Sequence, residues 1–275
     1  MDVILDDNNF STAPPISKSL ITQGNFELNF LTVLGYESSS PPLGALLKQY
    51  YQLEGEWLVA SPIFWQASHN DAFVVAANNG LELSDEESHA WFKEVEQFLL
   101  EENFSMHYHN AYTWLINATN KPQLNSQPVH LIMHKSLMPF LEEMDSTLYW
   151  QRIFTELQMF LTNHTYNLQR MNKPIINGLW FYGGGQFALN SKKLIMTNDV
   201  QYRSAFSQYI KQLELNEPID NKSILLLKNI SHKDIEQVAE LLKNRTVNWF
   251  WNNTAYQITK KYWWNKLWRG LMNAN

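Results

Sequence analysis

The sequence of 275 residues contains no cysteine. A disulfide scaffold, a thiolate nucleophile and a cysteine-ligated metal site are therefore excluded, and the composition fits a reducing compartment. No stretch of about 18 uncharged apolar residues is present, so we predict no membrane span. The N-terminus shows no basic segment followed by an apolar one, so we expect no signal peptide and a cytoplasmic location.

Positive charge is also scarce. The 21 lysines and arginines against 27 acidic residues give a formal net charge of −6. Basic residues form only pairs, such as Lys192-Lys193, so the chain lacks the electrostatic footprint of a nucleic-acid-binding protein. Hydrophobic residues make up 45% of the chain, which is typical of a globular protein with a core and argues against disorder.

The residues that are present favour an α+β (mixed α/β) protein with a central mixed sheet and packed helices, because candidate strands occur in adjacent pairs. Residues 1–42 are polar and contain prolines, and we predict that they form a loose leader and linker. Residues 43–275 then form a single domain, or two subdomains that divide near residues 120–146. The sequence leaves the oligomeric state open.

Apolar periodicity places the individual elements. The predicted helices cover 43–51, a segment that starts at Ser84, 147–164, 202–213, 231–243 and an aromatic C-terminal segment, 262–271. The predicted strands cover 56–65, 72–77, 106–110, 112–117, 179–182, 224–227, 247–251 and 256–259. Ser84 and Ser231 are predicted helix N-caps, and Glu87 is expected to complete a capping box with Ser84.

The clearest predicted helix spans residues 147–164. Its apolar residues repeat at helical spacing and include Trp150, Ile153, Phe154, Leu157, Phe160 and Leu161. We expect this stripe to pack on a sheet that contains residues 179–182. Arg152 and Glu156 are four residues apart and should meet on the opposite side of the helix.

Three of the ten glycines are consecutive, Gly183, Gly184 and Gly185, and they follow an apolar run that contains Trp180. Backbone amides in such a loop can hold an anion. The spacing matches neither the dinucleotide-binding fingerprint nor the P-loop pattern, so we predict no nucleotide-binding loop. A tight turn at the end of a strand is the alternative.

Histidines raise the question of a metal site. His107 and His109 alternate along a predicted strand, and together with His130 or His134 they could bind a metal ion. Their spacing matches no known ligand pattern, and no carboxylate lies beside the pair in the sequence. We therefore predict packing or surface roles for these histidines and no metal site.

A polar string precedes the glycines and contains Glu156, Gln158, His164, Asn167, Arg170 and Asn177. Residues 156–185 as a whole resemble the pattern NExQMLLHxHPVNxxRxxxGxPxxNxLWLWGGG. This pattern is typical of bacterial proteins known as cofactor-independent phosphoglycerate mutases or as regulators of pathogenicity-factor synthesis. A fainter echo occurs in archaeal-type phosphoglycerate mutases, which are two-metal enzymes of the alkaline phosphatase superfamily.

The chain departs from this family at several polar positions. The family's segment ADPVHLRAD corresponds to residues 60–68, where the replacements are Ser61, Phe64, Gln66 and Ser68. The Asp-Gly-x-x-Asp opening of the metal enzymes is missing, and Asp6-Asp7 is no substitute for it. Metal-dependent phosphoryl transfer needs clustered carboxylates and histidines, so we do not expect mutase activity.

Three functional hypotheses are consistent with these observations. The first is a non-catalytic small-molecule-binding or regulatory protein of this family, with an anion pocket and no cofactor. In that pocket Arg170 would pair with the anion and lie near Asn177 or the glycines. The second is a phosphoglycerate mutase-like phosphotransferase with two divalent metal ions, in which His164 is an acid/base or a metal ligand. The third gives the motif a purely structural role as a brace. The residues assigned to the pocket are Glu156, His164, Asn167, Arg170, Asn177, Trp180, Gly183, Gly184 and Gly185.

Overall fold

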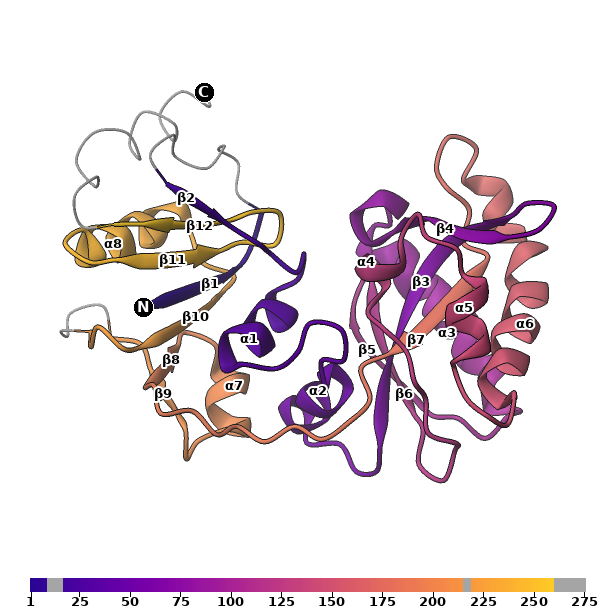
Figure 1. The fold of residues 1–275 in the computed structure, drawn as a ribbon, viewed down its shortest axis with the longest axis horizontal. Coiled ribbons are helices and arrows are strands. Elements are labelled where there is room, and N and C mark those ends of the chain that lie inside the picture. Colours follow the sequence, from indigo (N-terminus) through magenta and orange to yellow (C-terminus); the bar gives the residue numbers. More distant parts are fainter. Residues whose placement is uncertain (9–16, 215–218, 260–275) are drawn as a thin grey trace. The chain divides into compact units, whose positions relative to one another are not determined.

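The computed structural model describes residues 1–8, 17–214 and 219–259. Helices and two separate sheets are present, which confirms the predicted α+β class. The chain divides into two compact units (Figure 1). Unit 1 comprises Met1–Ser38, Gln49–Gln52 and Ala188–Asn275, and unit 2 comprises Ser39–Lys48 and Leu53–Phe187. Within the described residues, no helix has both the length and the apolar character needed to cross a membrane.

This division differs from the one that the sequence predicts. The expected leader, residues 1–42, instead supplies the strands β1 (Asp2–Asp6) and β2 (Lys18–Leu20) and the helix α1 (Phe26–Leu34). β1 pairs in parallel with β10 (Ile224–Lys228) on one side and β11 (Val247–Phe250) on the other. The apolar run of β1 is short, and its strand partners lie near the other end of the chain, so local sequence patterns could not identify it.

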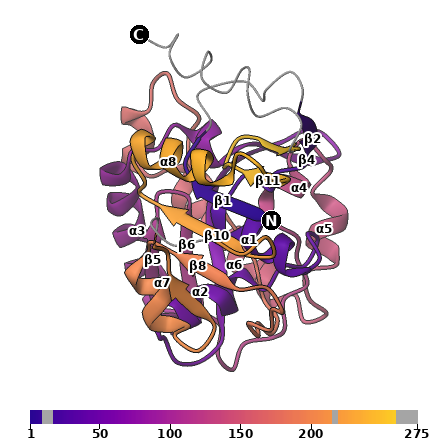
Figure 2. The same ribbon diagram turned by 90° about the vertical axis from the view of Figure 1, so that its left-hand side faces the viewer.

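Unit 1 is built on a seven-stranded sheet in the order β2-β12-β11-β1-β10-β8-β9. It also contains β8 (Ile195–Thr197), β9 (Ile210–Gln212) and β12 (Ala255–Ile258). The five strands from β11 to β9 are parallel, whereas β12 runs antiparallel to β11. Helix α8 (His232–Leu242) covers one face and contributes Ile235 and Val238 to the core, and α1 and α7 (Val200–Ala205) lie against the other face (Figures 1 and 2).

Two sequence predictions in unit 1 have clear outcomes. The predicted strands 247–251 and 256–259 are confirmed, and they form a hairpin in which β11 and β12 pair antiparallel. The helix predicted over 202–213 is wrong: α7 ends at Ala205, and Ile210 pairs with Ile195 in the sheet. Pairing with a neighbouring strand outweighs the local helical pattern there. The predicted helix 262–271 lies outside the described residues.

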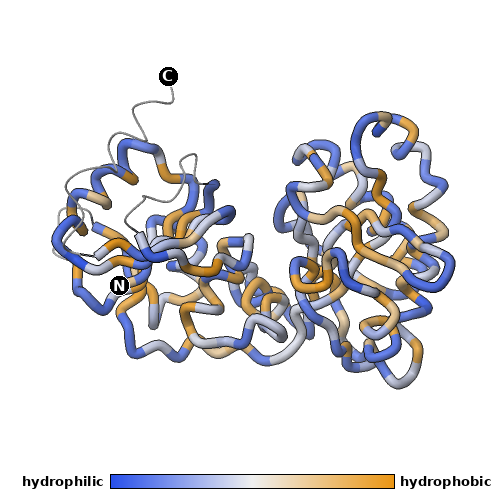
Figure 3. The backbone as a smooth tube through the Cα atoms, turned by 45° about the horizontal axis from the view of Figure 1, so that its top comes forward, coloured by the Kyte–Doolittle hydropathy of each residue, from blue (hydrophilic) through white to orange (hydrophobic). Residues whose placement is uncertain are grey.

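Unit 2 contains an antiparallel sheet in the order β4-β3-β6-β5, with β7 paired to β3. Its strands are β3 (Trp57–Ala67), β4 (Ala72–Ala77), β5 (Met106–Asn110), β6 (Thr113–Asn117) and β7 (Gly178–Tyr182). Its helices are α2 (Leu43–Tyr51, shared with unit 1), α3 (Asp85–Leu100), α4 (Val129–Ile132), α5 (Met138–Glu142) and α6 (Tyr149–Thr162), with 3-10 turns η1 (Asn78–Leu81) and η2 (Thr165–Gln169). Figure 3 shows that apolar segments gather inside each unit.

The predicted packing of the long helix is confirmed. α6 lies on β7, with the rings of Trp150 and Phe181 5.4 Å apart and those of Phe154 and Trp180 6.0 Å apart. All four of these side chains are buried, and aromatic rings bury a large apolar area each. The N-terminus of α6 is capped by Asp145, which the local pattern did not predict: its carboxylate accepts from the amide of Thr147 before the helix and from those of Tyr149 and Trp150 in it.

Candidate functional site

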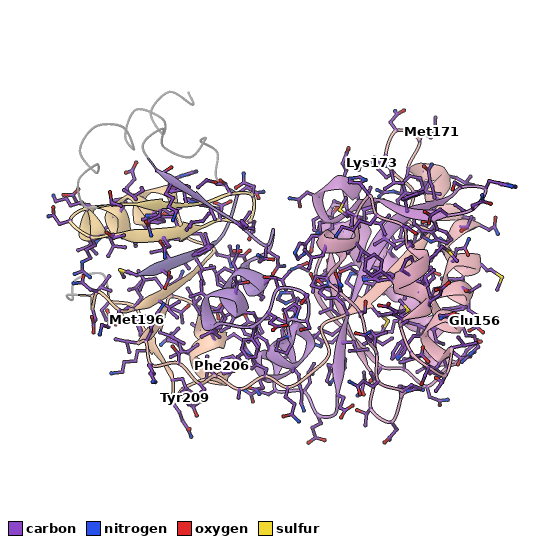
Figure 4. The ribbon with its side chains drawn as sticks, in the orientation of Figure 1. Glu156, Met171, Lys173, Met196, Phe206 and Tyr209 are labelled. Carbon is purple, nitrogen blue, oxygen red and sulfur yellow. The ribbon has the colours of Figure 1, made fainter. Side chains whose placement is uncertain are left out.

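The resemblance motif lies within unit 2 and runs along α6, η2 and β7, but its residues do not all converge. Glu156 is on α6, away from Met171 and Lys173 in the loop that precedes β7 (Figure 4). Its carboxylate lies 2.8 Å from Arg152, as predicted, and Arg152 also pairs with Glu102. Glu156 is therefore part of a surface ion pair and not of a pocket with Arg170.

Arg170 is the buried charge of the motif, with only 3% of its surface exposed. Its guanidinium contacts the carboxylate of Glu87 and the carbonyl of Leu81, and Nε donates to the carbonyl of Pro174 over 2.7 Å. Among these contacts of Arg170 there is none with Asn177 or with the glycines. The predicted capping box is not formed, because the carboxylate of Glu87 forms an ion pair with Arg170. Ser84 caps α3 without it, by accepting from the amide of Glu87.

The side-chain amides of the two asparagines in the motif form hydrogen bonds with backbone groups. Asn167 donates to the carbonyls of Leu161 and Ile176 and accepts from the amide of Ile176, each over 2.9 Å. Asn177 accepts from the amide of Trp65 over 2.9 Å and donates to its carbonyl over 2.8 Å. These bonds fix the segment between α6 and β7 against the sheet.

His164 and Trp180 are also engaged within the protein. Nδ1 of His164 accepts from the amide of Tyr166 over 3.3 Å, which caps η2, and Nε2 lies 3.4 Å from Glu94. The ring of His164 packs on Trp91. Trp180 is fully buried in the core, and its indole donates to the carbonyl of Gln127 over 2.8 Å.

The glycines form a turn at the end of β7. Gly183 has a φ of +81° and Gly185 a φ of +108°, both in the region that favours glycine. The carbonyl of Gly183 accepts from the amide of Gly44 over 2.9 Å, and a Cβ on Gly183 would lie 3.1 Å from that nitrogen. Positive φ and close backbone approach therefore explain this loop without a bound anion.

The histidines that could have formed a metal site do not assemble one with acidic neighbours. Among residues 1–8, 17–214 and 219–259, no group of three or more histidine, aspartate or glutamate side chains is arranged to hold a metal ion. His107 is partly buried, and this burial, together with the neighbouring His109, lowers its pKa. Burial likewise lowers the pKa of His130.

A second cluster of polar residues lies in unit 1, at the carboxyl ends of the parallel strands. β8 continues through α7 to β9 on one side, whereas β10 continues through α8 to β11 on the other. The strand order therefore reverses between β8 and β10, and such switch points are where open α/β sheets bind ligands. Five residues lie near this point, and we call them the carboxyl-edge site: Asp6, Glu27, Asp199, Tyr202 and Lys228.

Lys228 is the centre of this site. Its ammonium lies 3.1 Å from Glu27 Oε1 and 3.3 Å from Asp6 Oδ2. The rings of Phe26 and Tyr50 have their centroids 5.1 and 5.7 Å from the same nitrogen, a distance at which an ammonium is attracted to an aromatic face. The Lys228 side chain is 11% exposed and that of Asp6 is 32% exposed, so solvent reaches the site at Asp6.

The electrostatics of the site follow from burial and from its excess of carboxylates. Burial acts to lower the pKa of Lys228, but Glu27 and Asp6 outweigh it and hold this pKa above 10.5. Burial and then repulsion by Glu27 raise the pKa of Asp6 above 3.8, against the attraction of Lys228. Burial also raises the pKa of Tyr51 to about 12. Strongly shifted groups clustered at one edge are typical of functional sites.

Two polar atoms at this edge lack hydrogen-bond partners among the described residues. Tyr202 is fully buried and its hydroxyl has none, although Glu27, Asp199 and Asp6 lie within electrostatic reach of it. Asn252 has no partner for its Oδ1, while its Nδ2 donates to Asp6 over 3.3 Å. Such orphaned buried groups are explained by an ordered water or by a bound molecule.

Local sequence patterns do not predict the carboxyl-edge site, because its residues follow strands that are short. Asp6 and Lys228 each follow a short apolar run directly, and Asp199 comes two residues after the end of β8; residues in such positions lie at strand ends. Of the three strands, only β10, which ends at Lys228, is predicted from the sequence. The strands β1 and β8 are not predicted, so Asp6 and Asp199 could not be placed at strand ends.

Comparison with protein-family models found no match, and comparison with curated proteins found none either. A solved structure with a related arrangement is the cofactor-independent phosphoglycerate mutase from Thermoplasma acidophilum DSM 1728. The alignment covers 94% of this chain and 89% of that chain, at 12% sequence identity and a TM-score of 0.37. The likeness to a phosphoglycerate mutase is therefore distant, and it says nothing about the activity of this chain.

Proposed function

We propose that this protein is a small-molecule-binding or regulatory protein whose ligand binds at the carboxyl-edge site of unit 1. One observation carries the proposal: Lys228, Asp6 and Glu27 meet at the topological switch point, beside the unpartnered hydroxyl of Tyr202. Buried charges are costly, and their gathering at the edge where α/β sheets bind ligands is better explained by binding than by folding alone.

The resemblance motif is then a brace and not an anion pocket. An anion needs cationic or N–H donors that are not already used. Arg170 is paired with Glu87, and the side-chain amides of Asn167 and Asn177 bond to backbone groups. Removing such a network should cost stability without changing ligand affinity.

Phosphotransferase activity is the weaker alternative. Two-metal phosphoryl transfer needs carboxylates and histidines clustered around the cations, and in the part of the chain that the structure describes no group of three or more such side chains is arranged to hold a metal ion. Membership of the mutase-like family remains a proposal that rests on the motif of residues 156–185. A cytoplasmic location is also proposed, because the cysteine-free composition suits a reducing compartment.

A fragment screen by NMR on ¹⁵N-labelled full-length protein tests the proposal. We expect fragments to shift the amide signals of residues 6–8, 198–200 and 228–229 in a saturable way. Fragments that shift only the amide signals around Arg170 and Asn177 would instead support an anion pocket in the resemblance motif. A screen of several hundred fragments in which none perturbs the carboxyl edge would refute the proposal.

A further inference from the structure

Carboxylates outnumber the ammonium group in the carboxyl-edge site. Asp6, Glu27 and Asp199 supply three carboxylates, and Lys228 lies between the first two. Asp199 caps α7 by accepting from the amide of Tyr202 over 2.6 Å and lies 3.4 Å from the hydroxyl of Tyr50. Neither of these neighbours brings a positive charge to Asp199, so its carboxylate can interact with a second cation.

The unpartnered atoms of this edge are both oxygens. The hydroxyl oxygen of Tyr202 can accept a hydrogen bond, and so can Oδ1 of Asn252. The bond from Nδ2 of Asn252 to Asp6 fixes the orientation of this amide and leaves Oδ1 as an acceptor. A bound molecule that satisfies Oδ1 of Asn252 must therefore donate a hydrogen bond, and a second donor on the same molecule can serve the hydroxyl oxygen of Tyr202.

The surroundings of Lys228 show which chemistry this edge accommodates. An ammonium group already lies there between carboxylates and the faces of Phe26 and Tyr50. Aromatic rings combined with acidic groups are the usual recognition elements for organic ammonium ions. An anion would instead meet the repulsion of the surplus carboxylates.

We infer that the carboxyl-edge site binds a small organic ammonium, such as a primary amine, which enters at the exposed side of Asp6. Its N–H groups donate to Asp6, to Asp199 and to the hydroxyl oxygen of Tyr202. This inference rests on the proposed function and adds the chemical class of the ligand.

Three probes of equal length and different charge test the inference: butylammonium, butanol and butyrate. Each is titrated into the full-length protein at low ionic strength, because salt screens such attraction, and the edge amides are followed by NMR. We expect saturable shifts with butylammonium, at least tenfold weaker shifts with butanol, and none with butyrate. Equal responses to all three probes, or a preference for butyrate, would overturn the inference but leave binding at this edge intact.

Variants separate recognition from folding. Asp199→Asn removes a charge but keeps a good N-cap, and we expect it to weaken butylammonium binding at least threefold. Tyr202→Phe removes the unpartnered hydroxyl and should also weaken binding without lowering the melting temperature. Glu240→Gln is the matched control and should bind like the wild type, because Glu240 is an exposed carboxylate on α8 that pairs with its neighbour Lys243. Unchanged affinity in both Asp199→Asn and Tyr202→Phe would refute the inference.

Discussion

The guanidinium of Arg170 contacts the carboxylate of Glu87, a residue 83 positions earlier in the chain. This ion pair connects the segment after α6 to the first turn of α3, and Arg170 is almost completely buried. A buried charge that loses its partner is strongly destabilising, so the pair makes the two segments depend on each other.

Replacing either partner tests the brace. We expect Glu87→Gln and Arg170→Met each to lower the free energy of unfolding by about 3–5 kcal/mol, measured by urea denaturation. The double variant should lose less than the sum of the two, because the residues interact directly. Arg152→Ala is the control, since its exposed pairs contribute only about 0–1 kcal/mol. A small loss in Arg170→Met, together with stabilisation of the wild type by phosphate, would support an anion pocket instead.

The carboxylate of Asp145 should make the free energy of unfolding depend on pH in the acidic range. Burial acts to raise the pKa of Asp145, but hydrogen bonds from Thr147, Trp150 and Tyr149 outweigh it and lower the pKa below 3.8. Its contribution is therefore present above pH 3.8 and is lost as the pH falls through the lower, folded-state pKa. Asp145→Ala should cost about 1–2 kcal/mol at pH 7, and this difference should shrink on acidification. A difference that is constant with pH would contradict the assignment.

Asp6 should change the free energy of unfolding with pH in the opposite direction to Asp145. Its folded-state pKa is raised, so above pH 3.8 the folded protein holds more protons than the unfolded chain, and stability falls as the pH rises through this window. Asp6→Asn lacks this titration. We therefore expect its free energy of unfolding, relative to the wild type, to rise between pH 3 and pH 7. A relative free energy that stays flat or falls would show that Asp6 is not desolvated as described; Glu240→Gln serves as the surface control.

The turn after β7 should tolerate no side chain at its first position. Gly183→Ala combines a positive φ with a close approach to the amide of Gly44, and a left-handed conformation alone costs about 1–2 kcal/mol. Gly80→Ala is the control, because its Cβ would meet nothing nearer than 3.8 Å. Thermal melts should show a clear loss for Gly183→Ala and little change for Gly80→Ala. Equal melting temperatures would contradict the need for glycine in this turn.

The unpartnered hydroxyl of Tyr202 should cost stability in the unliganded protein. A buried polar group without a partner costs about 1–3 kcal/mol, so Tyr202→Phe should unfold at the same or a higher urea concentration than the wild type. Tyr202 is packed among Phe26, Phe30 and Phe206, and phenylalanine retains these ring contacts. A clear destabilisation would mean that the hydroxyl has a structural partner.

The success of sequence reasoning differs between the two units. In unit 2 the pairs β3–β4 and β5–β6 join neighbouring strands and α6 carries a clear apolar stripe, so local patterns identify these elements, although the pairing of β7 with β3 spans a long stretch of chain. In unit 1 the short strands β1 and β8 are stabilised by partners far along the chain, which no local period reveals. The candidate site could not be predicted for the same reason: Asp6 and Lys228 are brought together by the pairing of β1 with β10, which are far apart in the sequence. The partner of Arg170 was missed likewise, because Glu87 lies on another helix.

The pairing of Asp2 with Ile224 and with Asn248 has a consequence for biosynthesis. The ribosome releases the first strand of unit 1 long before it makes the strands on either side of it. All of Leu53–Phe187 is translated in between and can fold on its own local contacts, since domains fold as units in order of synthesis. The strand β1 therefore lacks its two partner strands, and is open to chaperones, until β10 and β11 have been synthesised.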